Sequence, residues 1–178
     1  MTRVGWVGLG AMGLPMARCV ARAGYTMTAY DIDPGRAASL AADGVKPAAS
    51  ISMVASGADV LVLMVATPGQ VEDVLFGDDP AASALAPGTV VLVMATVGPA
   101  VVQHWAGRLA EQQVVVVDTP VSGGVARAAG GDLLGMVGGS QTAVERVQPL
   151  LKRTLRLSGL ATVETALRKG RLVRRPFP

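Results

Sequence analysis

The chain has 178 residues, of which 51% are apolar but only 3% aromatic, and a formal net charge of +3. This length fits one domain, or one domain with an appendage. The apolar runs are much shorter than the roughly 18 residues of a membrane span, and a single cysteine, Cys19, excludes an internal disulfide framework. We therefore expect a cytoplasmic protein that does not enter a membrane.

The positive charge is confined to the C-terminal end of the sequence. Residues 1–151 contain eight Lys or Arg and twelve Asp or Glu, whereas residues 152–178 contain eight basic side chains and one acidic side chain. This change predicts a domain over 1–151, followed by a basic tail, 152–178, that is non-native or poorly ordered. A truncation or a shifted reading frame would explain the tail, and so would a natural basic extension. The tail lacks interleaved aromatic residues, so we expect no specific nucleic-acid binding.

The most informative segment lies at the N-terminus. An apolar run over 4–7 leads into Gly-x-Gly-x-x-Gly at residues 8–13, and a helical pattern follows. A strand, a tight turn and a helix in this order predict a dinucleotide-binding unit. Gly8 would allow the turn, Gly10 would let the backbone approach a pyrophosphate, and Gly13 would let the helix pack close to the strand.

A second predicted strand, 25–30, ends at Asp31, which lies 18 residues after Gly13. A carboxylate at this position accepts hydrogen bonds from the hydroxyls of an adenosine ribose. The alternative interpretation is a glycine-rich loop followed by an Asp that caps a helix. The strand–helix–strand context favours the dinucleotide interpretation.

Strands and helices alternate through the rest of the sequence. We expect helices over 36–42, 50–56, 68–76, 100–112 and 142–151, and strands over 59–65, 89–94, 114–117 and 133–137. This alternation predicts an α/β fold with a doubly wound, mostly parallel sheet. Ligands bind beyond the carboxyl ends of such strands, so the site should include the loops that follow them.

Two long motifs closely resemble the β-hydroxyacid dehydrogenase family, which includes 3-hydroxyisobutyrate dehydrogenase, tartronate semialdehyde reductase and, more distantly, 6-phosphogluconate dehydrogenase. One motif is Gly8–Ala17, and the other is Asp118–Gly124 with the later segments Gly131–Leu133 and Met136–Gly139. The resemblance covers residues 3–151 and implies a Rossmann-type fold that binds NAD(P) for hydride transfer with a β-hydroxyacid. Thr119 stands where the family usually has Ala.

The resemblance implies a role for each matching residue. The cofactor would be bound by Gly8, Leu9, Gly10, Ala11, Met12, Gly13, Asp31, Val65, Ala66, Gln70 and Thr96. Thr96 would lie beside the nicotinamide, and the substrate carboxylate would be bound by Ser122, Gly123 and Gly124. Asp31 would repel a 2′-phosphate, so NAD is favoured over NADP.

The family's catalytic lysine has no counterpart in this sequence. That lysine lies in a G-x-G-x-x-x-K-x-x-N segment that leads into an all-helical C-terminal domain, which is also absent here. Lys169 precedes a glycine and the sequence contains no Asn, so we assign no catalytic residue. We therefore expect the NAD-binding domain of a 3-hydroxyisobutyrate dehydrogenase-like oxidoreductase, truncated and inactive alone.

Two other functions stay open at this point. One is a working oxidoreductase that takes its proton donor from a partner chain. The other is a non-catalytic dinucleotide-binding module whose basic tail contacts an acidic partner. The expected partners are a small β-hydroxyacid, if a complete site forms, and a second copy of the chain in a homo-oligomer.

The remaining candidate groups favour simpler roles. His104, the single histidine, lies several residues into a predicted helix and away from the strand ends, which favours a structural or surface role. One Cys and one His cannot supply a typical zinc site, so we expect no metal.

Overall fold

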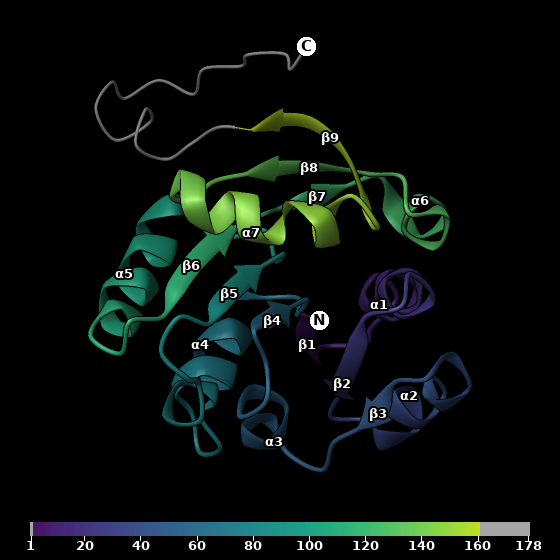
Figure 1. The fold of residues 1–178 in the computed structure, drawn as a ribbon, viewed down its shortest axis with the longest axis horizontal. Coiled ribbons are helices and arrows are strands. Elements are labelled where there is room, and N and C mark those ends of the chain that lie inside the picture. The colour runs from purple at the N-terminus through teal and green to yellow at the C-terminus, as the bar shows by residue number, and fades with distance from the viewer. Residues whose placement is uncertain (1, 161–178) are drawn as a thin grey trace.

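The computed structural model describes residues 2–160 and forms a six-stranded parallel sheet between two layers of helices (Figure 1). The strands are β1 (Arg3–Val7), β2 (Thr26–Tyr30), β3 (Lys46–Pro47), β4 (Val60–Leu63), β5 (Val90–Val93) and β6 (Val115–Asp118). Their order across the sheet is β3-β2-β1-β4-β5-β6. The chain thus reverses direction across the sheet between β1 and β4, which is the topological switch point where doubly wound sheets bind ligands. The predicted α/β fold is confirmed.

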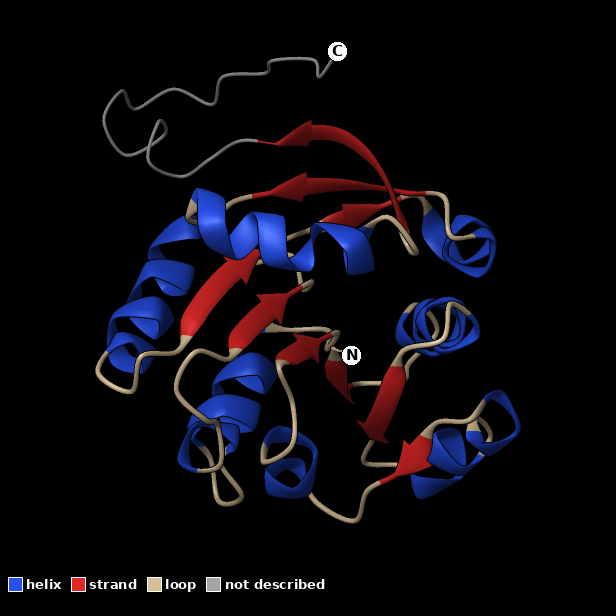
Figure 2. Ribbon diagram, viewed as in Figure 1, coloured by secondary structure: helices blue, strands red, loops and turns tan. Residues whose placement is uncertain are grey.

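Seven α-helices connect or flank the described strands. They are α1 (Gly13–Arg22), α2 (Pro34–Ala38), α3 (Ile51–Ala55), α4 (Pro68–Phe76), α5 (Pro99–Ala110), α6 (Gly124–Gly130) and α7 (Gln141–Leu151). Figure 2 shows α1 and α7 on one face of the sheet and α3, α4 and α5 on the other. None of the helices in this part of the chain is long and apolar enough to cross a membrane.

The central strands are buried on both faces because helices cover both. In β4, Val60 and Val62 pack in the apolar cluster beneath α1 and α7, whereas Leu61 and Leu63 pack in the cluster beneath α3, α4 and α5. Alternate residues of a strand point to opposite faces, so a strand between two helical layers is apolar throughout. This packing fixes the carboxyl edge of the sheet, where the sequence predicts the site.

A smaller three-stranded sheet continues from the end of β6. It consists of β7 (Val121–Ser122), which is antiparallel to β8 (Leu133–Val137), and β9 (Leu155–Leu160), which is parallel to β8. Asp118 and Gly138 join it to the main sheet through reciprocal backbone hydrogen bonds of 2.8 Å. The strand β9 lies beyond residue 151, so the proposed boundary there stays a prediction, and residues 161–178 lie outside the described residues.

The sequence prediction did not include the strands β3, β7 and β9, and it also differs from the structure around α2 and before β8. A helix was expected over 36–42, but α2 ends at Ala38 and is followed by a 3₁₀ turn, Ala41–Asp43. Asp33 starts α2 early because its side chain accepts a hydrogen bond from the Gly35 N–H at 3.0 Å. The region before β8 was expected to be a glycine-rich loop, but residues 124–130 form α6.

Candidate cofactor-binding site

The glycine-rich turn between β1 and α1 is locked to its neighbours. Gly8 has a φ of +95°, and a Cβ there would overlap the carbonyl oxygen of Met64. A Cβ on Gly13 would overlap the carbonyl oxygen of Gly8. The Gly8 carbonyl also accepts a 3.0 Å hydrogen bond from the Trp6 indole N–H, and the Gly8 N–H donates to the Tyr30 carbonyl at 3.0 Å. Both glycines are therefore needed for the turn itself.

The outer side of this turn has the features that a pyrophosphate requires. Within residues 2–160, no acceptor receives a hydrogen bond from the backbone N–H of Gly10, Ala11 or Met12. Apart from its neighbours in the chain, the described residues place only a guanidinium nitrogen of Arg36 within 4 Å of a Cβ built on Gly10, at 3.9 Å. Unpaired amides at the start of α1, with open space beside them, suit anionic phosphate oxygens. The turn thus fits the pyrophosphate of a dinucleotide.

Asp31 follows β2 and connects the turn to the start of α2. One carboxylate oxygen accepts a hydrogen bond from the Leu9 N–H at 2.6 Å, and the other accepts one from the Asp33 N–H at 3.0 Å. The residue is only 8% exposed. A carboxylate can accept about four hydrogen bonds, so these two leave capacity for the hydroxyls of a ribose.

The loop after β4 and the first turn of α4 contain three of the residues predicted to bind the cofactor. The Gln70 side-chain oxygen accepts hydrogen bonds from the N–H groups of Ala66 at 2.8 Å and Thr67 at 3.2 Å. The Thr67 hydroxyl accepts a hydrogen bond from the Gln70 N–H, which completes a capping box at the start of α4. Gln70 therefore shapes this loop. A direct contact of Val65, Ala66 or Gln70 with the cofactor stays a prediction.

The remaining predicted site residues follow the adjacent strands β5 and β6. Thr96 is exposed and lies in the loop between β5 and α5. Ser122 is exposed at the end of β7, and Gly123 and Gly124 have φ angles of +141° and +75°. These positive φ angles favour glycine over other residues. The loop therefore presents backbone without side chains next to the Ser122 hydroxyl.

Two buried polar groups at the end of β6 were not assigned a role from the sequence. Among the described residues, Asp118 Oδ1 and Thr119 Oγ1 are buried without a hydrogen-bond partner. Burial raises the pKa of Asp118 to about 6. The sequence signal for this buried carboxyl is its position: Asp118 is the last residue of the Val-rich strand β6, at the edge of a buried sheet.

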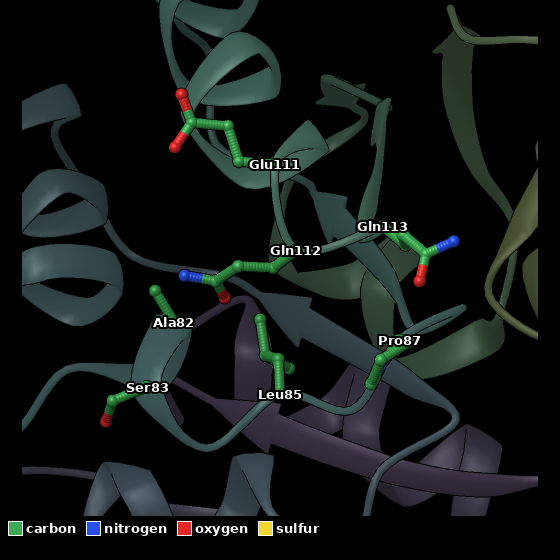
Figure 3. A pocket seen from close by; sticks show the side chains of 7 residues that line it. All are labelled: Ala82, Ser83, Leu85, Pro87, Glu111, Gln112 and Gln113. Atoms are coloured by element: carbon green, nitrogen blue, oxygen red, sulfur yellow. The ribbon is translucent and has the colours of Figure 1, made fainter.

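A surface pocket elsewhere does not coincide with the turn. It is lined by Ala82, Ser83, Leu85, Pro87, Glu111, Gln112 and Gln113 (Figure 3). These residues precede β5 and β6, so the pocket lies at the amino edge of the sheet, opposite the glycine-rich turn. His104 is exposed on α5. The part of the chain described contains no cluster of three or more His, Cys, Asp or Glu side chains suited to a metal ion.

Comparisons with known proteins agree with this geometry. Residues 3–158 match the family model for the NAD binding domain of 6-phosphogluconate dehydrogenase. The chain is 40% identical to L-threonate dehydrogenase of Cupriavidus necator over 148 residues, which cover 83% of this chain and 50% of that protein. It is 36% identical to NAD-dependent L-serine dehydrogenase of Pseudomonas aeruginosa over 152 residues, which cover 85% of this chain and 51% of that protein.

A crystal structure of 3-hydroxyisobutyrate dehydrogenase from Salmonella typhimurium superimposes with a TM-score of 0.85 at 36% identity, and covers 91% of this chain and 56% of that one. The chain thus spans about half the length of the curated relatives it matches. The family match includes both the turn that fits a pyrophosphate and Asp31, which can accept the ribose hydroxyls. The chain therefore belongs to the family of the NAD-binding domain of 6-phosphogluconate dehydrogenase, within the β-hydroxyacid dehydrogenases.

Proposed function

We propose that this domain holds NAD for hydride transfer to and from a small β-hydroxyacid, as part of a 3-hydroxyisobutyrate dehydrogenase-like oxidoreductase. The carrying observation is the row of unpaired amides at Gly10, Ala11 and Met12, placed at the topological switch point beside Asp31. The names of the relatives support a hydroxyacid, since L-threonate and L-serine both carry a carboxylate and a hydroxyl group.

The substrate carboxylate would bind at the loop Ser122–Gly124. Support comes from Ser122, which is exposed, and from Gly123 and Gly124, which are also exposed and have no side chain of their own beside their backbone amides. Backbone amides and a hydroxyl are donors suited to a carboxylate. Thr96, which follows the neighbouring strand β5, would lie beside the nicotinamide.

Binding and turnover are separable in this proposal. Hydride transfer to or from a hydroxyacid also needs a group that exchanges the hydroxyl proton at reaction distance. In residues 2–160 the lysines are Lys46 and Lys152, in β3 and directly after α7, and His104 lies in α5. None of these lies in the loop directly after β4, β5 or β6, so we expect this chain to bind NAD without turning over substrate.

One experiment with two readouts tests the proposal. The chain is saturated with NAD and titrated with 3-hydroxyisobutyrate, L-threonate and L-serine, while backbone amide shifts and NADH absorbance are recorded. We expect shifts at Gly123 and Gly124 for at least one hydroxyacid, with no measurable NADH formation. If the amide shifts of Gly123 and Gly124 stay unchanged at saturating hydroxyacid, the proposal that this loop binds the substrate carboxylate is contradicted. Turnover at roughly 1–1,000 per second would contradict the separation of binding from catalysis.

The cellular setting belongs to the same proposal. A cytoplasmic location, a homo-oligomer and the absence of specific nucleic-acid binding are expected from the sequence. The alternative function, contact of the basic tail with an acidic partner, depends mainly on residues 161–178, which lie outside the described residues.

A further inference from the structure

The carboxyl group of Asp118 is held in place at the end of β6 but is not neutralised there. The Asp118 backbone exchanges two hydrogen bonds of 2.8 Å with Gly138, which fixes the residue at the junction of the two sheets. Its Oδ1 atom is buried, and within residues 2–160 no hydrogen bond or ion pair joins the side chain to another residue. A carboxyl in this setting becomes charged only at a cost in free energy. Its ionisation should therefore respond to a charge that arrives nearby.

The elements packed against β6 do not supply a counter-charge to this carboxyl. These elements are β5, β8, α5 and α7, and the two strands contain no ionisable side chain. The ionisable side chains of the two helices and of the residues that end them are all exposed; they are His104, Arg108, Glu111, Glu145, Arg146 and Lys152. Burial is accordingly the cause that raises the pKa of Asp118 to about 6. The carboxyl thus gains and loses its proton close to neutral pH.

The position of Asp118 in the sheet relates it to the nicotinamide end of the cofactor. Asp118 pairs with Val93 of β5, and Thr96, which is expected beside the nicotinamide, lies three residues after Val93. Ser122 of the substrate loop lies four residues after Asp118, so their Cα atoms are at most about 14 Å apart. Two unit charges at about that distance, at an effective dielectric constant of about 20, change each other's equilibrium about sevenfold. A charge bound between these loops would therefore act on Asp118.

The oxidised and reduced cofactors differ in such a charge. The nicotinamide ring is positive in NAD⁺ and neutral in NADH, whereas the pyrophosphate and the two riboses are the same in both. An ionised carboxyl near the ring favours NAD⁺ over NADH, and a protonated carboxyl does not distinguish them by charge. The ratio of the two affinities therefore isolates the charge of the ring from every other contact of the cofactor.

We propose that Asp118 is a specificity-determining residue that couples a buried proton to the oxidation state of the cofactor: its carboxyl favours the ionised form when NAD⁺ is bound and the protonated form when NADH is bound. The proposal rests on the cofactor site described above. The proton that leaves the carboxyl when NAD⁺ binds goes to solvent, and no proton passes between Asp118 and the substrate. Above the ionisation midpoint of Asp118, the site therefore selects the oxidised cofactor.

The first test uses the unmutated full chain. The isotope-labelled side-chain carboxyl carbon of Asp118 is followed by NMR from about pH 5.5 to about pH 8, with saturating NAD⁺ in one series and saturating NADH in the other. The midpoint of its titration should be lower with NAD⁺ than with NADH by at least about half a pH unit, because the positive ring stabilises the ionised carboxyl. Equal midpoints in the two series would overturn the proposal.

The second test measures the same coupling from the side of the cofactor, since linkage is reciprocal. The NADH dissociation constant divided by the NAD⁺ dissociation constant, from calorimetric titration, should rise at least about threefold between about pH 5.5 and about pH 8. In Asp118→Asn the ratio should stay constant, because Asn does not ionise. Asp73→Asn is the matched control, since it removes the same charge from an exposed position on α4 and should keep the rise. Circular dichroism checks that each variant is folded.

Failure of this inference and failure of the proposed function give different results. If both cofactors bind but Asp118→Asn keeps the rise in the ratio, or Asp73→Asn loses it, Asp118 does not respond to the oxidation state. If Asp118→Asn does not fold, the two NMR midpoints of the unmutated chain decide the question. If the folded unmutated chain binds neither NAD⁺ nor NADH, the cofactor site itself is overturned, and this inference falls with it.

Discussion

Gly10 and Gly13 lie three residues apart in the same turn but have different tasks. A Cβ on Gly13 would overlap the Gly8 carbonyl, whereas a Cβ on Gly10 would meet no described atom beyond its chain neighbours closer than 3.9 Å. Gly13→Ala should therefore lower the free energy of unfolding by about 1–3 kcal/mol, as overpacking does. Gly10→Ala should change it by less than about 0.5 kcal/mol but weaken NAD binding at least tenfold.

Chemical denaturation and NAD titration of both variants measure these effects. The two variants serve as controls for each other, because they add the same methyl group within one turn. A stable Gly13→Ala variant, or a Gly10→Ala variant with unchanged NAD affinity, would contradict the division of tasks between the two glycines.

Asp118 makes the stability of the domain dependent on pH. Burial raises its pKa from 3.8 to about 6, so the folded chain retains a proton that the unfolded chain loses between these values. Stability from this group is fully present below about pH 4 and is lost as the pH rises to about 6. The loss is about 1–2 kcal/mol, reduced for solvent screening because the group is partly exposed.

Asp118→Asn tests this dependence, since Asn does not ionise. Thermal or chemical unfolding of both chains at pH 4 and pH 7 gives the comparison. The variant should gain stability relative to the unmutated chain as the pH rises. An equal difference at both pH values would show that Asp118 does not titrate in this range.

At the scale of elements, β9 decides where the domain ends. Leu155 is 4% exposed, packs in the cluster beneath α1 and α7, and pairs with Leu133 of β8. Leu155→Ala should therefore cost about 2–5 kcal/mol of unfolding free energy, measured by denaturant titration. The exposed Leu134, which is 39% exposed on β8, is the matched control, and Leu134→Ala should cost much less. Equal small effects would place the boundary near Leu151.

The elements that could be predicted from the sequence are those with strong local signals. The strand β4 is a continuous apolar run, and α4 begins with Thr67, Pro68 and Gln70, which form a capping box. In contrast, α6 has the sequence GVARAAG and ends with a glycine, so composition indicates a loop. The two-residue strand β7 exists because β8 pairs with it, a long-range contact that no local pattern contains.

At the scale of the whole molecule, the site residues that could be predicted are likewise those with a local sequence signal, and the others depend on long-range contacts. The glycine-rich turn and Asp31 were identified from spacing, because each follows a strand whose end the sequence marks. Arg36 was not, since its place over Gly10 depends on how α2 packs beside the turn. Asp118 was identified as a strand end, but its backbone pairing with Gly138, which joins the second sheet, is a long-range contact that no local pattern contains.

The central claim concerns the whole chain, and a calorimetric titration of the unmutated protein with NAD and NADP tests it most directly. The unpaired amides of the turn and the remaining acceptor capacity of Asp31 predict one NAD bound per chain. NADP should bind at least about tenfold more weakly, because the Asp31 carboxylate would repel a 2′-phosphate. Absence of NAD binding by the folded chain, or tighter binding of NADP than of NAD, would contradict the account.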